Sequence, residues 1–490
     1  MRLDELIAAG DAGQGTAVEI TGLAYDSGEV RPGGLFFCVK GFQRDGHNFA
    51  VQAVERGAAA LVVERPLSLG VPEVVVPSVR AVMGPAAVRF YGDPSAQLEV
   101  VGVTGTNGKT TTAFLLKALL EASDDGSGGG RGCGLLGTVK SVIGGVERPV
   151  SRTTPEAIDL QRDFRAMLDG GDRACAMEVS SHALELGRAE GIRFVAAIFT
   201  NLTQDHLDFH ETMEDYFQAK RRLFASAPNL SVVNVADPYG RRLAQEIDEA
   251  VTFAVEDDAD YSATDLRCDV EGCRFVLRTP AGRREVMLPM GGRFNVANAL
   301  GALASVHALR GNIDTLIAAL ERGVRVPGRF EPVQAGQEFA VIVDYAHTPD
   351  SLENVLRAAR DIARGRIICV FGAGGDRDRG KRPLMGEIAA RLADVTIVTS
   401  DNPRSEAPEA IVAEIVATIG DRPALQIELD RRMAIERAIA LAEADDVVVI
   451  AGKGHEQGQE FENGRKLPFD DITVAREILS AQLAAVGASK

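Results

Sequence analysis

One stretch of the chain, residues 100–112, combines features that few folds accommodate. It reads VVGVTGTNGKTTT and continues into the amphipathic sequence AFLLKALLEA. An apolar run typical of a strand enters a glycine-bearing turn, and the turn leads directly into a helical pattern. Loop amides and a helix N-terminus both present positive dipole ends to an anion. This order of strand, loop and helix therefore predicts an α/β domain that holds phosphate groups.

The residues of this turn suit a nucleotide triphosphate. Gly105 and Gly108 let the backbone approach closely, Lys109 has the length to reach terminal phosphates, and the Thr110 hydroxyl is a magnesium ligand in such loops. The standard spacing is not kept, because the first glycine stands one place early, at Gly102. A glycine-rich turn without a nucleotide is the alternative. The sequence that joins strand, GKT and helix favours the nucleotide site.

Length and charge limit what the rest of the chain does. Its 490 residues exceed a single core and suggest about three domains. Hydrophobic residues make up 46% and charged residues 25%, an ordinary globular composition. With 53 basic and 70 acidic side chains the net charge is -17. This balance excludes a basic field for nucleic acid or an anionic membrane, so any anionic substrate must be held by local Arg, Lys and amide groups. We expect small-molecule substrates and a monomer.

Cysteine usage and the N-terminus indicate a cytoplasmic protein. The sequence MRLDELIAAGDAGQG has no basic segment followed by an apolar one, and no run reaches the length of a membrane span. The cysteines form no CxxC pair, and most lie within apolar runs. We therefore expect free thiols in a reducing compartment at all six positions: Cys38, Cys133, Cys175, Cys268, Cys273 and Cys369.

Both ends of the chain are predicted to be α/β domains. Residues 1–97 contain the strand-like runs GLFFCV, AALVVE and EVVVP with helical sequence between them. Residues 327–490 alternate amphipathic helices with the strands FAVIVDYA, RIICVFGAGG, VTIVTSDN and DVVVIAGKGHE, which predicts a doubly wound parallel sheet. Ligands gather at the carboxyl ends of such strands, where the polar clusters are residues 344–347, 374–379, 401–404 and 452–456.

Strand-end side chains in the central part suggest a metal site. Glu178 directly follows the buried-strand pattern ACAM, and the apolar residues 196–199 lead in the same way to NLTQDHLDFH. A strand-end carboxylate near a phosphate loop is a natural ligand for magnesium, which prefers oxygen donors. Histidines also gather beside strand-end motifs, which indicates a site: His182, His206, His210 and His347.

Three further segments allow more than one interpretation or only a weak prediction. Lys220 lies in the helical sequence TMEDYFQAKRRLF, and its periodicity alone is typical of a solvated lysine. Asn295 and Asn298 are one helical turn apart, where paired amides suit an adenine edge but helix capping by Asn295 is equally compatible. Residues 123–134, SDDGSGGGRGCG, have the composition of a flexible surface excursion before the next strand.

Taken together, the motifs resemble those of the Mur ligases of peptidoglycan synthesis, which are ATP-dependent amide-forming enzymes. The resemblance covers nearly the whole chain through GVTGTNGKTTT, TTPE, MEVSSHAL, FTNLTQDHLDFH, FNVANALGA, PGRFE, VDYAHTPDSLENVL, FGAGGDRDRGKRPLMG, SDNPR and AGKGHE. It implies three domains: a UDP-sugar-binding domain at 1–97, a central P-loop ATPase at 98–326 and a Rossmann-like amino-acid-binding domain at 327–490.

The resemblance also implies a reaction. The expected activity adds meso-2,6-diaminopimelate to the D-glutamate γ-carboxylate of UDP-N-acetylmuramoyl-L-alanyl-D-glutamate through an acyl phosphate. Magnesium and Lys109 would offset the repulsion between carboxylate and triphosphate. One alternative is a related ligase that adds L-lysine or D-glutamate, or one that adds glutamates to folate. The others are a P-loop NTPase without ligase activity and a non-catalytic binding protein.

By resemblance, individual residues receive roles. The catalytic residues would be Lys109, Lys220, His206 and Glu178, and the magnesium ligands Thr110, Glu178, His206 and Lys220, the last as a CO₂-derived carbamate. ATP would be bound by Gly105, Thr106, Asn107, Gly108, Lys109, Thr110, Thr111, Asn295, Arg329, Asp344 and His347. The UDP-sugar would contact Ser27, Phe42, Gln43, Arg44, Thr153, Thr154, Ser180 and Arg188. Diaminopimelate would contact Arg377, Asp401, Asn402, Pro403, Arg404, Gly452 and Glu456.

The sequence also indicates which amino acid is selected, and it departs from the family pattern at two positions. Lysine lacks one carboxylate of diaminopimelate, so a selective site needs a cation, and Arg404 supplies a planar fork for bidentate pairing. The alternative for DNPR is an Asx-Pro turn with a surface arginine. Where relatives commonly carry arginine and glutamine, this chain has Gly28 and Leu186, so its UDP-sugar contacts are expected to differ in detail.

Overall fold

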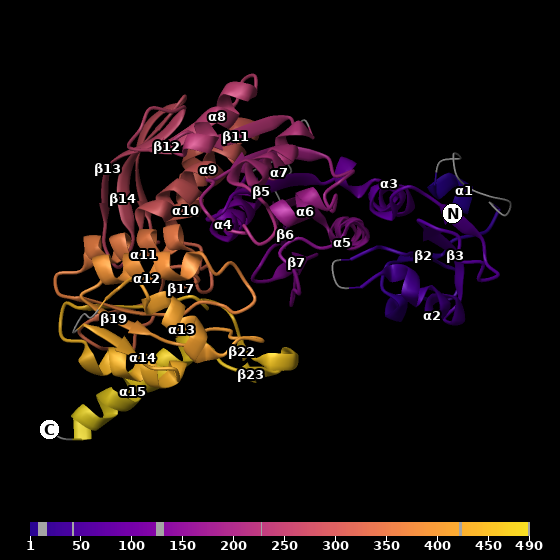
Figure 1. The fold of residues 1–490 in the computed structure, drawn as a ribbon. Helices are drawn as coiled ribbons and strands as arrows, with labels where there is room; N and C mark the ends of the chain where they lie inside the picture. Colours follow the sequence, from indigo (N-terminus) through magenta and orange to yellow (C-terminus); the bar gives the residue numbers. More distant parts are fainter. Residues whose placement is uncertain (8–16, 42–43, 124–131, 227, 421–423, 489–490) are drawn as a thin grey trace. The chain divides into compact units, whose positions relative to one another are not determined.

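The computed structural model describes residues 1–7, 17–41, 44–123, 132–226, 228–420 and 424–488. Contacts between residues divide the chain into two compact units, and Figure 1 shows its elements. The first unit comprises Met1–Gly102, Arg131–Ala197 and Ala219–Asn229; the second comprises Val103–Gly130, Ile198–Gln218 and Leu230–Lys490. Three elements contribute residues to both units: β5 (Glu99–Thr104), β10 (Phe194–Phe199) and α7 (Met213–Ala225).

The N-terminal part of the first unit is a four-stranded parallel sheet in the order β1-β2-β3-β4. Its strands are β1 (Gly22–Ala24), β2 (Gly34–Phe37), β3 (Ala58–Val63) and β4 (Glu73–Val75). The helices are α1 (Leu3–Leu6), α2 (Ala50–Glu55), α3 (Val79–Tyr91) and the 3₁₀ turns η1 (Ser27–Glu29), η2 (Gly46–Phe49) and η3 (Pro94–Ala96). Two apolar clusters bury the two faces of the sheet, as the hydrophobic runs of this segment predict.

The remainder of the first unit carries strand-end residues of the predicted site. Here β6 (Gly132–Leu136) pairs in parallel with β9 (Asp172–Glu178) and antiparallel with β7 (Ser141–Ile143), which pairs with β8 (Val146–Arg148). The helices are α5 (Ala157–Asp169) and α6 (Ser181–Glu185). Of the predicted surface excursion at 123–134, residues 124–131 lie outside the described residues. Its last three residues belong to β6, so the prediction is wrong for them because the strand begins earlier than the glycines suggested.

The central part of the second unit extends from parallel to antiparallel strands. Strands β11 (Leu230–Asn234), β12 (Val251–Val255) and β13 (Tyr261–Cys268) pair in parallel, and β14 (Cys273–Thr279) and β15 (Gly282–Leu288) follow as an antiparallel meander. The helices are α4 (Lys109–Ala122), α8 (Pro238–Glu246), α9 (Arg293–Leu309) and α10 (Ile313–Glu321). α4 packs against α9, so the helix that follows the phosphate loop is buried on a second helix.

Two cysteines depart from the sequence prediction. Cys268 and Cys273 are directly paired residues at the turn between β13 and β14 and form a disulfide, with their Cα atoms 4.0 Å apart. The expectation of six free thiols is therefore wrong at these two positions. A CxxC spacing search misses this pair because the strand register, rather than the sequence interval, brings the two sulfurs together. The other four cysteines are buried thiols, as expected.

The C-terminal part of the second unit is a doubly wound sheet, as predicted. Its strand order is β16-β17-β21-β18-β19-β20, parallel except for β16. The strands are β16 (Glu331–Pro332), β17 (Ala340–Asp344), β18 (Ile367–Phe371), β19 (Val395–Val398), β20 (Leu425–Ile427) and β21 (Val447–Ala451). A separate two-stranded ladder consists of β22 (Gly458–Glu460) and β23 (Lys466–Pro468), joined through η4 (Glu462–Gly464).

Helices cover both faces of the C-terminal sheet (Figure 1). They are α11 (Pro349–Ile362), α12 (Lys381–Leu392), α13 (Pro408–Val416), α14 (Arg431–Leu441) and α15 (Asp471–Ala488). Alternate strand residues such as Ile342 and Cys369 pack with α11, α12 and α13 in one apolar cluster. Their neighbours Val343 and Val370 pack with α14 and α15 in another. The continuous apolar runs of these strands are thus explained by burial on both faces.

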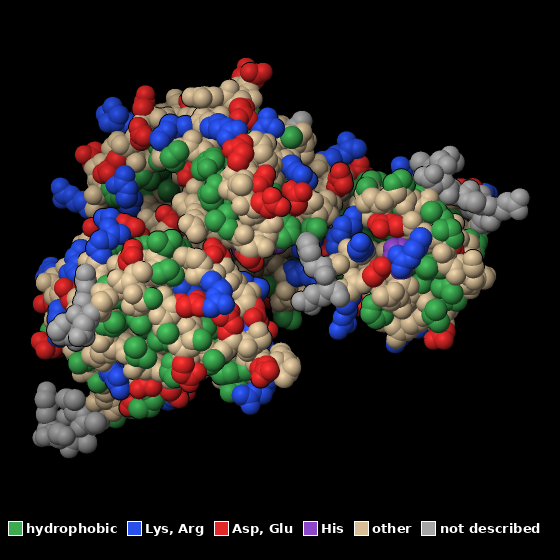
Figure 2. Space-filling view, viewed as in Figure 1, with side chains coloured by type: hydrophobic (Ala, Val, Ile, Leu, Met, Phe, Trp, Pro, Cys, Tyr) green, Lys and Arg blue, Asp and Glu red, His purple; other side chains and the backbone are tan. Residues whose placement is uncertain are grey.

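The surface is mixed in charge. Figure 2 shows acidic and basic side chains interspersed over the visible face, with apolar side chains between them. Within the described ranges, no helix combines the length and apolarity that crossing a membrane requires.

Candidate active site

The phosphate loop, residues 105–108, connects the end of β5 to the start of α4. Gly108 has φ 86°, and a Cβ there would lie 2.3 Å from Asn298 Oδ1. A Cβ on Gly105 would lie 1.9 Å from Thr200 Oγ1. Both positions therefore exclude a side chain, because the loop backbone lies directly against neighbouring polar groups. The glycines identified in the sequence are required by this close approach.

Hydrogen bonds fix the phosphate loop on its neighbours. The Asn107 amide donates to Asn201 Oδ1 at 2.8 Å, and Thr200 Oγ1 donates to the Asn107 carbonyl at 2.6 Å. Asn107 Nδ2 also donates to Asp350 Oδ2 on α11 at 2.7 Å. These bonds hold both the backbone and the side chain of the loop in one orientation, which is the pre-organisation that an anion site requires.

Lys109 lies over the loop that it follows. Its Nζ donates to the carbonyl oxygens of Gly105 at 3.0 Å and Thr106 at 2.8 Å. The ammonium is thus held beside the turn rather than extended into solvent. A cation at this place, together with the N-terminus of α4, makes the loop electrostatically positive.

A cavity in the second unit opens beside the phosphate loop. It brings together residues from the loop, from α9 and α11, and from the segment that follows β17. Six residues predicted to bind ATP line it: Asn107, Gly108, Thr111, Arg329, Asp344 and His347. Five others are not among its lining residues: Gly105, Thr106, Lys109, Thr110 and Asn295. Sequence reasoning did not single out several others that do line it: Thr200, Asn234, Phe253, Phe294, Ser351 and Asn354.

The two asparagines of α9 have different places. Asn298 lines the cavity, whereas Asn295 is fully buried behind it. Asn295 Nδ2 donates to the Gly291 carbonyl at 2.8 Å, and Asn298 Nδ2 donates to Asn295 Oδ1 at 3.2 Å. Helical spacing places both residues on one face, but only the packing decides that Asn298 faces the cavity. Adenine binding by Asn295 itself stays a prediction.

Arg329 links the cavity to the start of α4. Its Nη2 donates to Thr110 Oγ1 at 3.0 Å, and its guanidinium lies 4.5 Å from the centre of the Tyr345 ring. Burial raises the pKa of Asp344 to about 6, although the Arg329 charge and the Phe330 amide, 2.6 Å from Oδ2, act in the opposite direction. A fixed cation thus faces the cavity beside a carboxyl group that is easily protonated.

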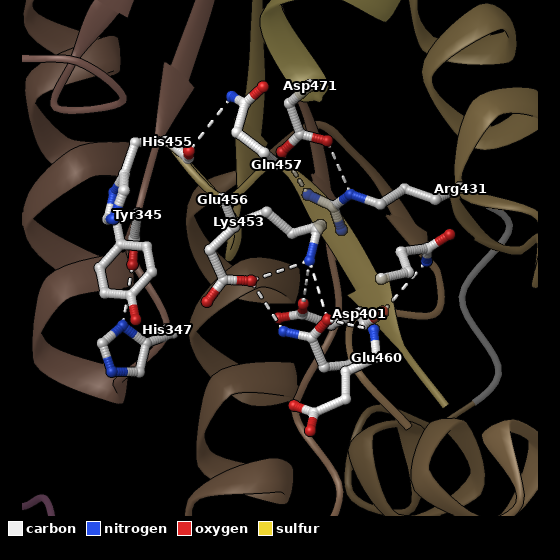
Figure 3. A network of polar contacts seen from close by, with 12 residues as sticks. Tyr345, His347, Asp401, Arg431, Lys453, His455, Glu456, Gln457, Glu460 and Asp471 are labelled. Carbon is white, nitrogen blue, oxygen red and sulfur yellow. Dashed lines mark hydrogen bonds and ion pairs between the residues drawn. The ribbon is translucent and has the colours of Figure 1, made fainter. Parts of the chain in front are cut away.

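His347 also lines this cavity. Burial, and then the positive charge of Lys381, lower its pKa. Its Nδ1 lies 2.9 Å from the Tyr345 carbonyl oxygen, which accepts but does not donate, so Nδ1 carries the proton. When the ring is neutral, Nε2 is its acceptor. Figure 3 shows His347 beside the Tyr345 ring.

A second set of polar side chains lies in and around the segment that follows β10. His206 has a left-handed backbone with φ 56°, and its Nε2 lies 3.5 Å from Asp205 Oδ2. Burial would raise the pKa of Asp205, but His206, His347 and Lys381 outweigh it and lower the pKa to about 2. Lys381 Nζ lies 4.0 Å from Asp205 Oδ1. Sequence reasoning missed this buried lysine, whose only signal is its position within the motif GKRPLMG.

In the first unit, Glu178 and four residues predicted to bind the UDP-sugar lie close together. The buried Glu178 carboxylate accepts from the Thr138 amide at 2.7 Å and the Thr138 hydroxyl at 3.0 Å. The Thr138 and Thr153 hydroxyls are 3.1 Å apart, and Thr154 Oγ1 donates to the Glu178 carbonyl at 2.9 Å. The other two predicted residues, Ser180 and Arg188, bond to Thr154. The Ser180 amide donates to Thr154 Oγ1, and Arg188 Nη1 donates to the Thr154 carbonyl.

The other predicted UDP-sugar residues belong to the N-terminal sheet. Ser27 is buried, and its hydroxyl donates to Gln52 Oε1 at 2.7 Å. Arg44 is exposed. Phe42 and Gln43 lie outside the described residues.

Lys220 is not the solvated lysine that its helical periodicity suggests. Its side chain is only 1% exposed, on the buried side of α7. Burying an ammonium is costly, so a lysine at such a position is more often modified, paired or deprotonated than a surface lysine is. The carbamate inferred from resemblance stays a prediction.

Residues at the carboxyl end of the C-terminal sheet surround a buried lysine (Figure 3). Lys453 has no exposed side-chain surface, and its Nζ lies 2.9 Å from Asn402 Oδ1, 2.9 Å from Glu456 Oε2 and 3.4 Å from Asp401 Oδ1. Asn402 Nδ2 also donates to Glu456 Oε2 at 2.7 Å. These residues form the Lys453 cluster: Asp401, Asn402, Lys453 and Glu456. Three of its members were predicted to bind diaminopimelate, and Lys453 itself was missed.

A second buried ion pair lies beside this cluster. Arg431 and Asp471, at the N-termini of α14 and α15, have no exposed side-chain surface and pair through two bonds of 2.8 and 2.7 Å. Burial would raise the pKa of Asp401, but the charges of Lys453 and then of Arg431 outweigh it and lower that pKa. The carboxylate of Asp401 is therefore ionised and held by two buried cations. Gly452, with φ 114°, leaves space for it, because a Cβ there would lie 3.0 Å from Asp401 Oδ2.

Arg404 lies at the end of the same loop. Its backbone is left-handed with φ 51°, and its side chain is 20% exposed. Nε donates to Glu460 Oε2 at 3.0 Å, and Nη1 donates to the Gly375 carbonyl at 2.7 Å. Arg404 is thus held by its surroundings, unlike the free surface arginine of the Asx-Pro alternative. Arg377 is exposed, and its Nη1 donates to the Asp376 carbonyl at 3.1 Å.

Family models match three successive segments of the chain. They are described as Mur ligase family, catalytic domain, at residues 19–93; Mur ligase middle domain, at 103–306; and Mur ligase, glutamate ligase domain, at 328–454. A protein from Syntrophomonas wolfei named UDP-N-acetylmuramoyl-L-alanyl-D-glutamate--2,6-diaminopimelate ligase is 45% identical over 480 residues, which cover 95% of this chain and 96% of that protein. The chain belongs to the Mur ligase family.

Further comparisons agree with this membership. A Geobacillus thermodenitrificans protein of the same name is 47% identical over 472 residues, covering 94% of each chain. A solved structure of a ligase with that name matches this Mur ligase with a TM-score of 0.69 and 33% identity over 99% of both chains. The MurF ligase from Thermotoga maritima in complex with ADP shares the fold, with a TM-score of 0.68 and 19% identity over 96% of this chain and 98% of that one. The three-domain α/β architecture is thereby confirmed, whereas the exact boundaries at 97 and 326 stay predictions.

The residues predicted to bind magnesium in this Mur ligase have side chains that suit this ion. The Thr110 hydroxyl in the first turn of α4 and the buried Glu178 carboxylate are the hard oxygen donors that Mg²⁺ prefers. Histidine and lysine are less usual ligands, and a carbamate on Lys220 would replace the ammonium by two oxygens. Among the residues that the structure describes, no group of three or more His, Cys, Asp or Glu side chains stands together as a metal site by itself.

Proposed function

We propose that this Mur ligase joins meso-2,6-diaminopimelate to the D-glutamate γ-carboxylate of UDP-N-acetylmuramoyl-L-alanyl-D-glutamate and converts ATP to ADP and phosphate. The observation that carries the proposal is the identity of 45% and 47% with relatives of that name over nearly their full length. The Arg404 guanidinium, fixed at the end of the Lys453 cluster, supports the choice of amino acid. A second carboxylate on the substrate would satisfy this cation, and lysine would leave it unpaired.

The proposed chemistry has two steps. An oxygen of the γ-carboxylate attacks the γ-phosphorus of ATP, and the bond to the bridging oxygen breaks, which gives an acyl phosphate and ADP. The amine of diaminopimelate then attacks the acyl carbon, loses a proton, and displaces inorganic phosphate as the amide forms. The first step brings a carboxylate toward a polyanion, so Lys109, the loop amides and Arg329 would lower the barrier by offsetting charge.

Magnesium would be held at two places, one ion by Thr110 and Glu178 and the other by His206 with a carbamate on Lys220. When bound, it supplies positive charge to the phosphate oxygens. Two neighbouring residues position these ligands. Thr138 orients the Glu178 carboxylate through two hydrogen bonds, and Arg329 donates to the Thr110 hydroxyl. Positioning of these ligands by neighbours is what keeps a metal site in register.

Lys220 is expected to carry a carbamate in the active enzyme. A buried ammonium repels a cation, whereas the carbamate gives two oxygens and a negative charge. Intact-protein mass spectrometry in bicarbonate should detect the added mass of one CO₂, which acid treatment removes. Lys220→Ala should lose about a hundredfold in turnover. An unmodified amine, together with full activity of Lys220→Ala, would refute the carbamate.

Arg404→Ala is expected to remove the preference for diaminopimelate. Loss of a bidentate charge-assisted pair should lower kcat/KM for meso-diaminopimelate by about a hundredfold, with little change for L-lysine. The ratio of kcat/KM for the two amino acids measures the effect. Arg364→Ala, which alters an arginine elsewhere in the same domain, is the control. An Arg404→Ala enzyme that still prefers diaminopimelate would overturn the assignment of this residue.

A panel of amino acids tests the function itself. Purified protein is incubated with ATP, magnesium and UDP-N-acetylmuramoyl-L-alanyl-D-glutamate, and each candidate amino acid is added in turn. We expect a tripeptide nucleotide with meso-diaminopimelate and phosphate release only when both co-substrates are present. Release of ADP without a tripeptide product would instead favour a P-loop NTPase without ligase activity. A product with L-lysine alone would favour the related lysine-adding ligase.

We also propose that the protein works as a cytoplasmic monomer. Its substrates are ATP and small polar molecules, and its surface shows mixed charge on the visible face (Figure 2). Light scattering coupled to size-exclusion chromatography, with cell fractionation, checks both points. A stable dimer or a membrane-associated pool would contradict them.

A further inference from the structure

The β22–β23 ladder lies beside residues 401–404, the loop that carries Asp401 and Asn402 of the Lys453 cluster. Gln459 Nε2 donates to the Asp401 carbonyl at 3.0 Å, and the Glu460 amide donates to Asn402 Oδ1 at 2.9 Å. The Arg404 amide in turn donates to the Glu460 carbonyl at 3.0 Å. Gln459 and Glu460 of β22 are therefore both bonded to residues 401–404, and the ladder supports this loop.

Glu460 makes a second, side-chain contact to the same loop. Its Oε2 accepts from Arg404 Nε at 3.0 Å, while the Gly375 carbonyl accepts from Arg404 Nη1 at 2.7 Å. The guanidinium is thus held from two sides, by an acid on β22 and by a carbonyl that follows β18. Arg404 also has a left-handed backbone, φ 51°, which a non-glycine residue keeps only when its surroundings impose it.

The Glu460 carboxylate is separate from the Lys453 cluster. Figure 3 shows it directed away from Lys453, although its backbone amide belongs to the network drawn there. Lys453 instead pairs with Asp401 and Glu456. The charge of Glu460 is therefore directed at Arg404.

We propose that Glu460 is a positioning residue that sets the orientation of the Arg404 fork, and through it the selectivity for an amino acid with a second carboxylate. This inference rests on the proposed function, in which Arg404 binds that carboxylate. A guanidinium has five N–H donors, of which bidentate pairing with a ligand uses two. The contacts with Glu460 and Gly375 use two others and fix the plane of the fork before the ligand arrives. Fixing it in advance removes a cost that the ligand would otherwise meet on binding.

Three single variants test the proposal. Glu460→Ala should raise KM for meso-diaminopimelate about tenfold with kcat within a factor of three, and lower the diaminopimelate-to-lysine ratio of kcat/KM about tenfold. KM for ATP should not change. Glu460→Gln should recover most of the loss, because its amide oxygen still accepts from Arg404 Nε. Glu462→Ala is the matched control: it removes an exposed carboxylate two residues further along the same hairpin and should behave as the parent enzyme.

A double variant separates this inference from the proposed function. If Glu460 acts through Arg404, then Glu460→Ala in the Arg404→Ala background should have no further effect on selectivity. Selectivity that survives in Arg404→Ala alone would overturn the proposed function of Arg404. Selectivity lost in Arg404→Ala but kept in Glu460→Ala would overturn only the inference about Glu460. A lower KM in Glu460→Ala would overturn it as well, since Glu460 would then compete with the ligand for the guanidinium.

Discussion

Lys109→Ala is expected to lower the rate of ligation by about a thousandfold. The Lys109 ammonium is held over the phosphate loop by the carbonyls of Gly105 and Thr106, next to the N-terminus of α4. It is the cation of that loop, and the first chemical step brings two anions together there. Removing one preorganised donor to a developing charge costs a factor of about 10² to 10³, and a full charge lies at the upper end. ADP release and tripeptide formation, both followed with saturating substrates, measure the loss.

A lysine on the same helix provides the control. Lys117 is partly exposed on α4 and pairs with Glu121 one turn further on. Surface pairs of this spacing contribute about 0.3–0.5 kcal/mol, so Lys117→Ala should keep full activity and nearly the same melting temperature. Lys109→Ala should also melt near the parent temperature, because the two bonds from Lys109 to the carbonyls of Gly105 and Thr106 lie at a partly exposed place. A Lys109→Ala enzyme with more than half of the parent rate would refute its role in offsetting phosphate charge.

Local patterns explain why the sequence predicted the phosphate loop and the C-terminal sheet. The turn at Gly105 and Gly108 is indicated by the glycines themselves, since a side chain at either position would collide with a neighbouring polar group of the folded chain. The strands β17, β18 and β21 are continuous apolar runs because both of their faces are buried. Strand ends, and hence the polar residues beyond them, are then fixed by the topology of a parallel sheet.

Residues whose partners are set by the folded chain were not predicted from the sequence. Lys453 and Lys381 look like ordinary lysines in glycine-rich turns, and only the folded chain places them against Asp401 and Asp205. The Cys268–Cys273 disulfide depends on the register of β13 and β14. In each case the sequence interval carries no signal, because the partners are set by which strands and loops meet.

Lys453→Met is expected to have the largest effect on the C-terminal domain. Lys453 is the buried partner of Asp401 and Glu456, and its removal leaves both carboxylates without their shared cation. Breaking a buried ion pair by removing one member costs about 3–5 kcal/mol, which corresponds to a loss of roughly 10 °C in the melting temperature of a domain this size. KM for meso-diaminopimelate should rise by about a hundredfold, since three residues predicted to bind it lose their common anchor.

The pH dependence of this loss has a definite sign. The Lys453 charge lowers the pKa of Asp401 in the folded protein, so the pair contributes stability above the unfolded carboxyl pKa and loses it as the pH falls through the lowered one. The difference in melting temperature between parent and Lys453→Met should therefore be large at neutral pH and shrink below about pH 4. Differential scanning calorimetry across this range measures it.

Two further variants decide whether the effect comes from the buried charge. Lys466→Met makes the same change at an exposed position on β23 and should alter neither melting temperature nor KM. Asp401→Asn combined with Lys453→Met removes an acid that would otherwise be buried without its cation, so the double variant should be more stable than Lys453→Met alone. Its affinity for diaminopimelate should stay low, because Asn402 and Glu456 still lack their anchor. If Lys453→Met melted within about 2 °C of the parent and kept its KM, the cluster would be a passive feature of the fold and the anchor role of Lys453 would be wrong.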